Sequence, residues 1–194
     1  FSRLLSAFLS RTLISGVQPK VIAPLTDKAN LTSDDYIIKS WGETYPHLSE
    51  NEYFCLKAAE RAGLNTVDFS LSENKKLLLV KRFDRLKSSD LQPGFEEVCA
   101  LQGKSRQQKY LGSYEQVIKT IEIFTSEQHR LTSMREAYKN ILLSFILRNG
   151  DAHLKNFGIL YSADLTQRYL APAYDIVNTT TYLPKDTPAL NLFG

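Results

Sequence analysis

The chain has 194 residues, 43% of them apolar and 23% charged, which is typical of a globular protein with one domain or two small lobes. Nine glycines and seven prolines exclude a collagen-like or low-complexity chain, and no apolar run approaches the roughly 20 residues that span a bilayer. The formal charge of +3 comes from scattered lysines and arginines, so direct binding to nucleic acid is not expected.

The cysteines and the first residue of the sequence give expectations about the cellular compartment of the protein and about its full length. Cys55 and Cys99 are the two cysteines of a sequence without a secretory segment, which predicts reduced core thiols rather than a disulfide. We therefore expect a cytoplasmic protein that has no membrane anchor. The sequence begins with Phe1 rather than Met, and we expect it to be part of a longer protein.

Two hairpins are expected within the first 84 residues. Apolar runs on both sides of a polar turn at residues 27–35 predict a hairpin over residues 20–39, with Lys39 at the end of its second strand. Two further β-rich runs, at residues 66–71 and 76–83, flank a turn-like stretch and predict a second hairpin.

A helix is expected between the hairpins. Ser49 followed by Glu52 fits a helix-start box, and Gly63 supplies a stop signal. Apolar residues recur at helical spacing between them, which predicts a helix over residues 50–62. The expected order of the first part is strand, strand, helix, strand, strand.

The remainder of the chain is predominantly helical in pattern. Helical periodicity is expected at residues 95–101, 114–124 and 134–147, and two short strands at residues 157–161 and 168–173. Ser133 and Glu136 fit a capping box at the start of the third helix. The broad buried face predicted for that helix consists of Tyr138, Ile141, Leu142, Phe145 and Ile146.

A polar loop after the third helix carries the most informative motif. Asp151 and Asn156 lie five positions apart, which is the spacing of the protein-kinase catalytic loop. In that chemistry the Asp accepts the proton of the attacking hydroxyl, the Asn holds Mg²⁺, and a later Asp holds the metal against the phosphates. Asp175 is placed for this last role, and His153 is placed to meet the transferred phosphate.

The same residues also fit simpler readings. The Asp-to-Asn spacing often occurs by chance, a polar cluster after a helix is usually a solvated loop, and a lone histidine such as His153 is more often a surface or hydrogen-bonded residue than a ligand. His47 and His129 have no metal-ligand spacing, so zinc is not expected. No nucleophile elbow and no Walker loop are present.

Six segments resemble, in the same order, the HipA-like toxin kinases, and most of all their short HipT-type members. They are residues 14–20 (Ile-Ser-Gly-Val-Gln-Pro-Lys), 36–39, 51–52, 80–85, 148–158 and 171–177. The resemblance implies an α+β, bilobal, protein-kinase-like fold. Residues 1–84 would form the β-rich lobe and residues 85–194 a helical lobe that is incomplete in this chain.

The resemblance also implies roles for the residues of the catalytic and metal-binding segments. Asp151 would be the catalytic base, and Asn156 and Asp175 would bind Mg²⁺. His153 would contact phosphate or nucleotide. Gly150 stands where ordinary kinases carry an Arg before the base, which fits the toxin-kinase pattern.

Further implied roles concern ATP. Lys39 would contact the ATP phosphates, and backbone groups of Lys81 and Phe83 would meet the adenine edge. Ser15 and Gly16 would belong to the phosphate loop, with Ser15 as a site of self-inactivating autophosphorylation. For Glu52, pairing with Lys39 and a purely capping role remain equal alternatives.

By this resemblance the protein is an ATP- and Mg²⁺-dependent serine/threonine kinase of a bacterial toxin–antitoxin system. The implied target is a cytoplasmic protein such as an aminoacyl-tRNA synthetase, whose phosphorylation arrests translation. The implied partner is a helix-turn-helix antitoxin, through which DNA is contacted only indirectly. The alternative is a catalytically silent kinase-like module that binds an antitoxin. The retained carboxylates argue against this alternative, because acidic groups in one cleft repel each other unless a cation joins them.

Overall fold

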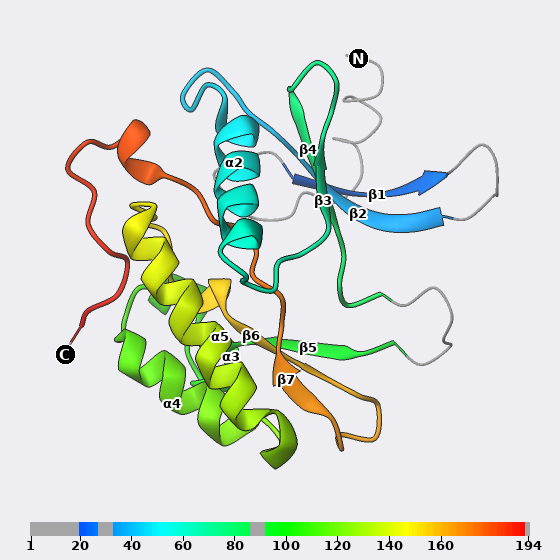
Figure 1. Cartoon of the computed structure of the whole chain (residues 1–194), viewed down its shortest axis with the longest axis vertical. Helices are drawn as coiled ribbons and strands as arrows, with labels where there is room; N and C mark the ends of the chain where they lie inside the picture. Colours follow the sequence, from blue (N-terminus) through cyan, green and yellow to red (C-terminus); the bar gives the residue numbers. More distant parts are fainter. Residues whose placement is uncertain (1–19, 27–32, 86–91, 193–194) are drawn as a thin grey trace.

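A computed structural model describes residues 20–26, 33–85 and 92–192 (Figure 1). The predicted phosphate-loop residues Ser15 and Gly16 lie outside the described residues. Two antiparallel sheets and their helices form the mixed α and β architecture that the sequence predicted. None of the helices in the described segments combines the length and apolarity needed to cross a bilayer.

The first sheet has four strands in the order β1-β2-β4-β3. Its strands are β1 (Lys20–Thr26), β2 (Ser33–Ser40), β3 (Phe69–Leu71) and β4 (Leu77–Lys81). Helix α2 (Leu48–Arg61) packs on this sheet through Leu56 and Ala59, which join Leu78 and Val80 in one buried cluster. Both predicted hairpins and the helix between the strands are therefore confirmed.

The second sheet has the order β5-β6-β7 and lies with helices α3 to α5 in the lower half of Figure 1. These elements are β5 (Gly94–Glu97), α3 (Val98–Leu101), α4 (Tyr114–Phe124), α5 (Glu127–Ile146), β6 (Gly158–Tyr161) and β7 (Arg168–Leu170). Short 3-10 turns lie at η1 (Arg106–Gln108), η2 (Leu154–Asn156) and η3 (Thr179–Thr181). The predicted lobe boundary at residues 84–85 stays a prediction.

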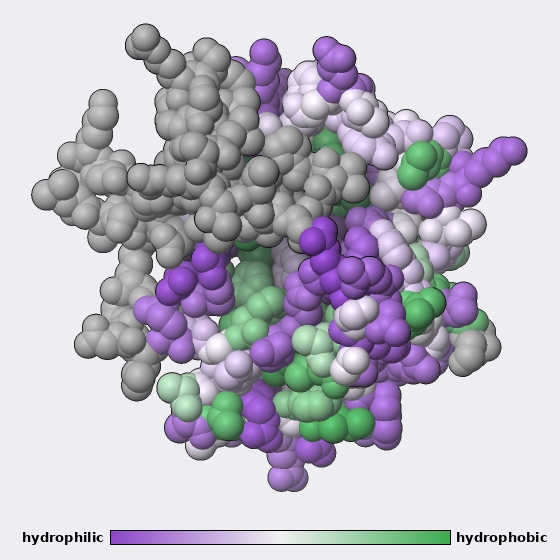
Figure 2. All heavy atoms as spheres, turned by 180° about the vertical axis from the view of Figure 1, so that it is seen from behind, coloured by the Kyte–Doolittle hydropathy of each residue, from purple (hydrophilic) through white to green (hydrophobic). Residues whose placement is uncertain are grey.

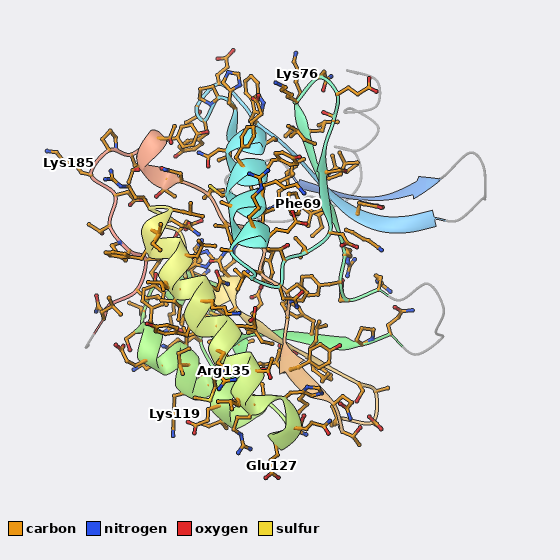
Figure 3. The ribbon with its side chains drawn as sticks, viewed as in Figure 1. Phe69, Lys76, Lys119, Glu127, Arg135 and Lys185 are labelled. Carbon is orange, nitrogen blue, oxygen red and sulfur yellow. The ribbon has the colours of Figure 1, made fainter. Side chains whose placement is uncertain are left out.

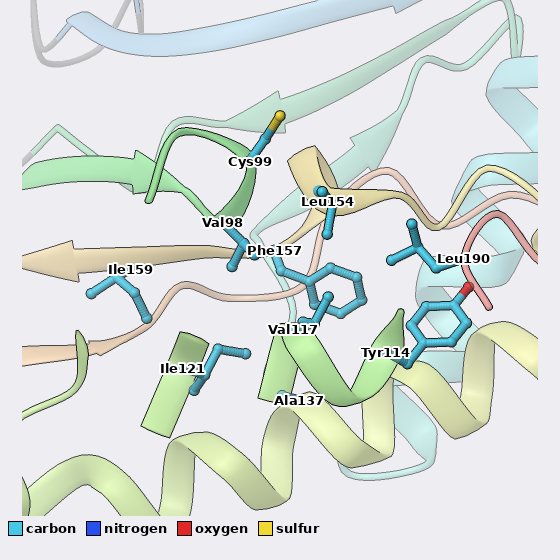
Figure 4. Close-up of a cluster of buried hydrophobic side chains, with 10 residues drawn as sticks. All are labelled: Val98, Cys99, Tyr114, Val117, Ile121, Ala137, Leu154, Phe157, Ile159 and Leu190. Carbon is cyan, nitrogen blue, oxygen red and sulfur yellow. The ribbon is translucent and has the colours of Figure 1, made fainter. Parts of the chain in front are cut away.

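A buried cluster holds the second half together (Figure 4). Val117 and Ile121 of α4 are fully buried, and their spacing of four places them on one face of the helix. They meet Ala137 of α5 and Phe157 and Ile159 around β6. Helix α4 begins after Ser113, whose Oγ accepts a hydrogen bond from the Gln116 N–H at 3.4 Å. The helix predicted for residues 114–124 is confirmed.

Helix α5 begins earlier than predicted. Its first residue is Glu127, after Ser126, so Ser133 and Glu136 are not a capping box. Ser133 lies buried inside the helix, where its Oγ accepts a hydrogen bond from the Leu170 N–H at 3.1 Å. The hydroxyl therefore ties α5 to β7 instead of starting the helix.

The predicted buried face of α5 is also wrong for four of its five residues. Tyr138, Phe145, Ile146 and Leu142 are exposed at 63%, 64%, 63% and 46%, and only Ile141 packs against the core. The buried positions are small or polar: Ser133, Ala137, Asn140 and Ser144. Small side chains let the α5 backbone approach its neighbours closely, and this requirement has no signal in hydrophobic periodicity.

Exposed polar and apolar side chains are mixed over the surface. Lys119 and Glu127 point away from the helical part in Figure 3, and Lys76 lies at the tip of the β3–β4 hairpin. On the face seen in Figure 2, green apolar side chains gather in the lower part among hydrophilic ones. Cys55 and Cys99 are buried free thiols, as predicted.

Two predicted boundaries shift because of backbone pairing between segments that are distant in the sequence. Residues 95–97 were predicted as helix and instead form strand β5, which pairs with β6. Strand β7 ends at Leu170 because Ala173 bridges in parallel to Thr66 of the first half. The Ala173 N–H donates to the Asn65 carbonyl at 2.8 Å, and the Ala173 carbonyl accepts from the Val67 N–H at 3.1 Å. This crossing brings Asp175 beside the first sheet.

Candidate functional site

A cavity of about 830 Å³ is lined both by the first sheet with α2 and by the segments that follow α5. Its volume lies in the range of small-molecule and cofactor sites. Every predicted site residue within the described segments lines it: Lys39, Lys81, Phe83, Asp151, His153, Asn156 and Asp175. Residues that are far apart in the sequence thus share one site.

A buried charge cluster joins β2, α2 and the crossing segment, which comprises residues 171–175 between β7 and the first sheet. The Lys39 ammonium is 3% exposed and forms ion pairs with Glu52 of α2 and with Asp175. Burial alone would lower the pKa of Lys39, but the two carboxylates outweigh it and raise that pKa. Lys39 is therefore a permanent cation. Of the two alternatives for Glu52, pairing with Lys39 is confirmed.

Helix α2 is positioned without the predicted start box. The helix begins at Leu48, after His47, whose side chain makes no capping hydrogen bond. Ser49 is buried, and its hydroxyl donates to the Lys39 carbonyl at 3.2 Å. This bond and the Lys39–Glu52 ion pair both join the start of α2 to β2.

The catalytic-loop segment is held by side chains rather than left in solvent. Asn149 and Asn156 are buried, and their Oδ1 atoms accept from the backbone N–H groups of Asp151 at 3.2 Å and His153 at 2.9 Å. The Gly150 N–H donates to Thr179 Oγ1 at 2.8 Å. These buried partners show that the segment is not a fully solvated loop, while its catalytic role stays a prediction.

Gly150 occupies a position where no side chain fits. A Cβ atom there would lie 2.0 Å from Asp186 Oδ2 and 2.8 Å from the Thr187 carbonyl. The residue before Asp151 is therefore confined to glycine by the segment around Asp186. This explains why no Arg precedes the predicted base.

His153 is a buried and neutral base. Burial is the main cause that lowers its pKa to about 4. The Asp151 carboxylate raises this pKa and the Lys109 ammonium lowers it further, and the net effect is the lower value. Its Nε2 lies 2.8 Å from Lys109 Nζ and 3.8 Å from Asp151 Oδ1. Near pH 7 the neutral ring carries one N–H, so it can donate one hydrogen bond to a phosphate but brings no positive charge.

Asp151 faces the cavity with a hydroxyl already bound to it. The Tyr110 hydroxyl donates to Asp151 Oδ1 at 2.6 Å. The side chain of Asp151 is 48% exposed, so a ligand in the cavity can reach it. Tyr110 and Lys109 were not predicted as site residues, because they lie in a segment without a motif and contact Asp151 and His153 only in the folded chain.

The donor set for a metal consists of oxygen atoms. Asp175 and Asn156 line the same cavity, and the carboxylate and amide oxygens of these residue types are hard donors that suit Mg²⁺, which takes its remaining ligands from phosphates and water. These residues fit a nucleotide-bound Mg²⁺. Within the described segments there is no cluster of three or more histidine, cysteine or acidic side chains that could hold a metal by itself.

Aromatic rings form another wall of the cavity. The Phe83 ring lies 5.6 Å from that of Tyr174 and 5.1 Å from that of Phe95, measured between centroids. The Lys81 N–H already donates to the Asp68 carbonyl at 2.8 Å, so it is not free for an adenine ring. The aromatic wall suits a flat, apolar ligand face.

Comparisons with known proteins point to one family. The profile of the HipA-like C-terminal domain family matches residues 12–194. The chain is 31% identical over 186 residues to the protein named "Putative kinase" of Haemophilus influenzae, covering 87% of this chain and 53% of that protein. It is 28% identical over 205 residues to "Putative kinase Y4dM" of Sinorhizobium fredii, covering 93% of this chain and 48% of that protein. The chain thus spans about half the length of the curated relatives it matches.

Solved structures share the fold. A chain in the complex of HipA, HipB and operator DNA from Shewanella oneidensis matches with a TM-score of 0.73 at 21% identity, over 93% of this chain and 47% of that one. The proinflammatory kinase CtkA of Helicobacter pylori matches with a TM-score of 0.54 at 17% identity, over 85% of this chain and 55% of that one. Both likenesses concern the fold alone.

Proposed function

The chain belongs to the HipA-like C-terminal domain family, and from this premise we propose that it carries the catalytic site of an ATP- and Mg²⁺-dependent serine/threonine kinase. The observation that supports this proposal is the convergence of Lys39, Asp151, Asn156 and Asp175 on one cavity of about 830 Å³. Phosphoryl transfer asks a protein mainly to align its substrates and to neutralise charge. The convergent residues offer both.

Each residue of the site has a role in this proposal. Asp151 accepts the proton of the attacking hydroxyl, and the permanent cation Lys39 holds the ATP phosphates. Asn156 and Asp175 bind Mg²⁺, which when present neutralises charge on the phosphates. Neutral His153 offers a hydrogen bond to phosphate, and the backbone near Phe83 faces the adenine.

The partners in this proposal follow from the family. The Shewanella neighbour assembles with HipB and operator DNA, which favours an antitoxin partner for this chain and contact with DNA only through it. The target would be a cytoplasmic protein, for which an aminoacyl-tRNA synthetase is our candidate, and its phosphorylation would arrest translation. Autophosphorylation of Ser15 belongs to the same proposal.

Replacement of the base tests the proposal. In the full-length protein, Asp151→Asn should lower phosphate transfer from γ-labelled ATP to a serine/threonine peptide library by about 10²- to 10⁴-fold, because the hydroxyl proton loses its acceptor. ATP binding, measured by calorimetry, should persist. Asp164→Asn is the matched control, because Asp164 lies in the exposed turn between β6 and β7.

The control should transfer phosphate like the unmodified protein. Undiminished transfer by Asp151→Asn would show that Asp151 is not the base. Nucleotide binding without any transfer by the unmodified protein would instead favour the silent binding module.

A further inference from the structure

Tyr110 makes the hydrogen bond that a substrate would be expected to make. Its hydroxyl donates to Asp151 Oδ1 at 2.6 Å, which is the distance of a strong bond to a carboxylate. A general base must lie within hydrogen-bond reach of the hydroxyl whose proton it takes. In this structure the phenol of Tyr110 holds that place.

We propose that Tyr110 fills the acceptor subsite, and that the serine or threonine hydroxyl of the protein substrate must displace it to reach Asp151. This inference rests on the proposed function, since it requires Asp151 to be the base. Tyr110 is then a residue that controls access of the acceptor, and it takes no part in the transfer itself.

The Tyr110 side chain can rotate away from Asp151 without disrupting the packing of a buried core. Tyr110 is 46% exposed, and its ring contacts His153 edge to face at 5.2 Å between centroids. Lys109 Nζ lies 4.7 Å from the centre of the same ring. These are contacts at the rim of the cavity, and the hydrogen bond to Asp151 is the one the hydroxyl donates. A hydroxyl of another molecule can donate an equivalent hydrogen bond to Asp151 in its place.

The backbone around Tyr110 is fixed, so the exchange requires only side-chain rotation. The Leu111 N–H donates to the Gln108 carbonyl at 2.9 Å, and the Lys109 carbonyl accepts from the Leu154 N–H at 3.1 Å. The second bond ties the Tyr110 segment directly to the turn that follows Asp151. Two side-chain torsions of Tyr110 are then enough to open the subsite.

The acidity of the phenol agrees with this role. Burial and the neighbouring carboxylate of Asp151 both raise the pKa of Tyr110, so the hydroxyl stays protonated and remains a donor. The subsite therefore favours a neutral hydroxyl that donates to Asp151, as an aliphatic alcohol does.

Removal of the hydroxyl tests the inference in the full-length protein. Tyr110→Phe keeps the ring and deletes the competing donor, so the KM for a serine peptide chosen from the library should fall by about 5- to 30-fold. The KM for ATP and kcat should stay unchanged, a split that a structural role would not produce. Tyr169→Phe, which changes an exposed tyrosine of β7 outside the cavity, should leave all three constants unchanged.

Each outcome decides the matter. A lower KM for the peptide in Tyr110→Phe, with unchanged kcat and unchanged KM for ATP, would support the inference. An unchanged or higher KM for the peptide, a lower kcat, or phosphate on Tyr110 itself in a peptide map would overturn the inference and leave the kinase proposal standing. Absence of transfer by both proteins would overturn the proposed function and this inference with it.

Discussion

His153 shows how one buried side chain makes stability depend on pH. Its imidazole lies beside the Lys109 ammonium at 2.8 Å and the Asp151 carboxylate at 3.8 Å, and burial lowers its pKa to about 4. Asp175 also faces it and favours the charged form. In the unfolded chain the same ring has the ordinary pKa of about 6.5.

The sign of the pH effect follows from these two values. Between about pH 6.5 and pH 4 the unfolded chain binds a proton that the folded chain does not, so stability falls as the pH falls through this window. The loss reaches about 3 kcal/mol at pH 4 from this residue alone. Urea unfolding between pH 7 and pH 4 should show it, and His153→Asn should remove that part of the slope.

A matched histidine provides the control. His47 is exposed, with 68% of its side chain open to solvent, so His47→Asn should keep the slope of the unmodified protein. Parallel pH curves for His153→Asn and the unmodified protein would mean that His153 is not held neutral by burial.

Helix α5 shows how a helix can bury its small residues and expose its large ones. Ala137 is fully buried against α4 and β6, whereas the next residue, Tyr138, is 63% exposed. The hydrophobic pattern predicted the opposite for Tyr138. The packing density between α4 and α5 thus depends on the absence of a side chain beyond Cβ at residue 137.

Two substitutions to the same residue distinguish the two faces of α5. Ala137→Leu should lower the free energy of unfolding by about 1–3 kcal/mol, because the added carbons overpack the interface with α4. Tyr138→Leu should change it by no more than about 0.5 kcal/mol. Chemical denaturation of the two variants measures both values. Equal costs, or a larger cost at Tyr138, would show that the face is assigned wrongly.

The crossing segment between β7 and Asp175 links the two sheets. Ala171 continues the pairing with β6 through a bond of 2.9 Å to the Gly158 carbonyl, and two residues later Ala173 pairs with the first half. Ala173 and Ile176 then join the core of the first sheet. These hydrogen bonds therefore position Asp175 next to Lys39, which is 136 positions earlier in the chain.

Under the proposed function, nucleotide bound in the cavity between the two halves would stabilise the whole molecule. A ligand that binds only the folded chain stabilises it by about 2.7 kcal/mol at 100 times its Kd. For a chain of 150–250 residues that corresponds to a rise in Tm of roughly 5–10 °C, and for a longer chain to a smaller rise. Thermal unfolding of the full-length protein with and without Mg²⁺ and ATP measures the shift.

Lys39 should carry much of this coupling. Lys39→Met removes the cation that we propose contacts the ATP phosphates, so the shift caused by nucleotide should be lost, whatever the Tm of the variant alone. Lys119→Met, at an exposed position of α4, should keep the full shift. A full shift in Lys39→Met would exclude contact between Lys39 and the phosphates.

Local patterns in the sequence determined the elements of this protein, and only the tertiary structure decided how they meet. The apolar runs of the two hairpins and the spacing within α4 act over a few residues, so both hairpins and the bounds of α4 were predictable. The spacing of Asp151 and Asn156, together with the family resemblance, likewise singled out a segment that lines the cavity, and its catalytic role stays a prediction.

Contacts between distant residues left no such signal. The buried side of α5 depends on how closely α4 approaches, and the end of β7 depends on pairing with residues 65–67. The hydroxyl on Asp151 comes from Tyr110, 41 positions away. Periodicity indicates which side chains of a helix or strand could be buried. Which of them are buried depends on the packing of the whole chain, because each buried surface is formed by two or more elements that are distant in the sequence.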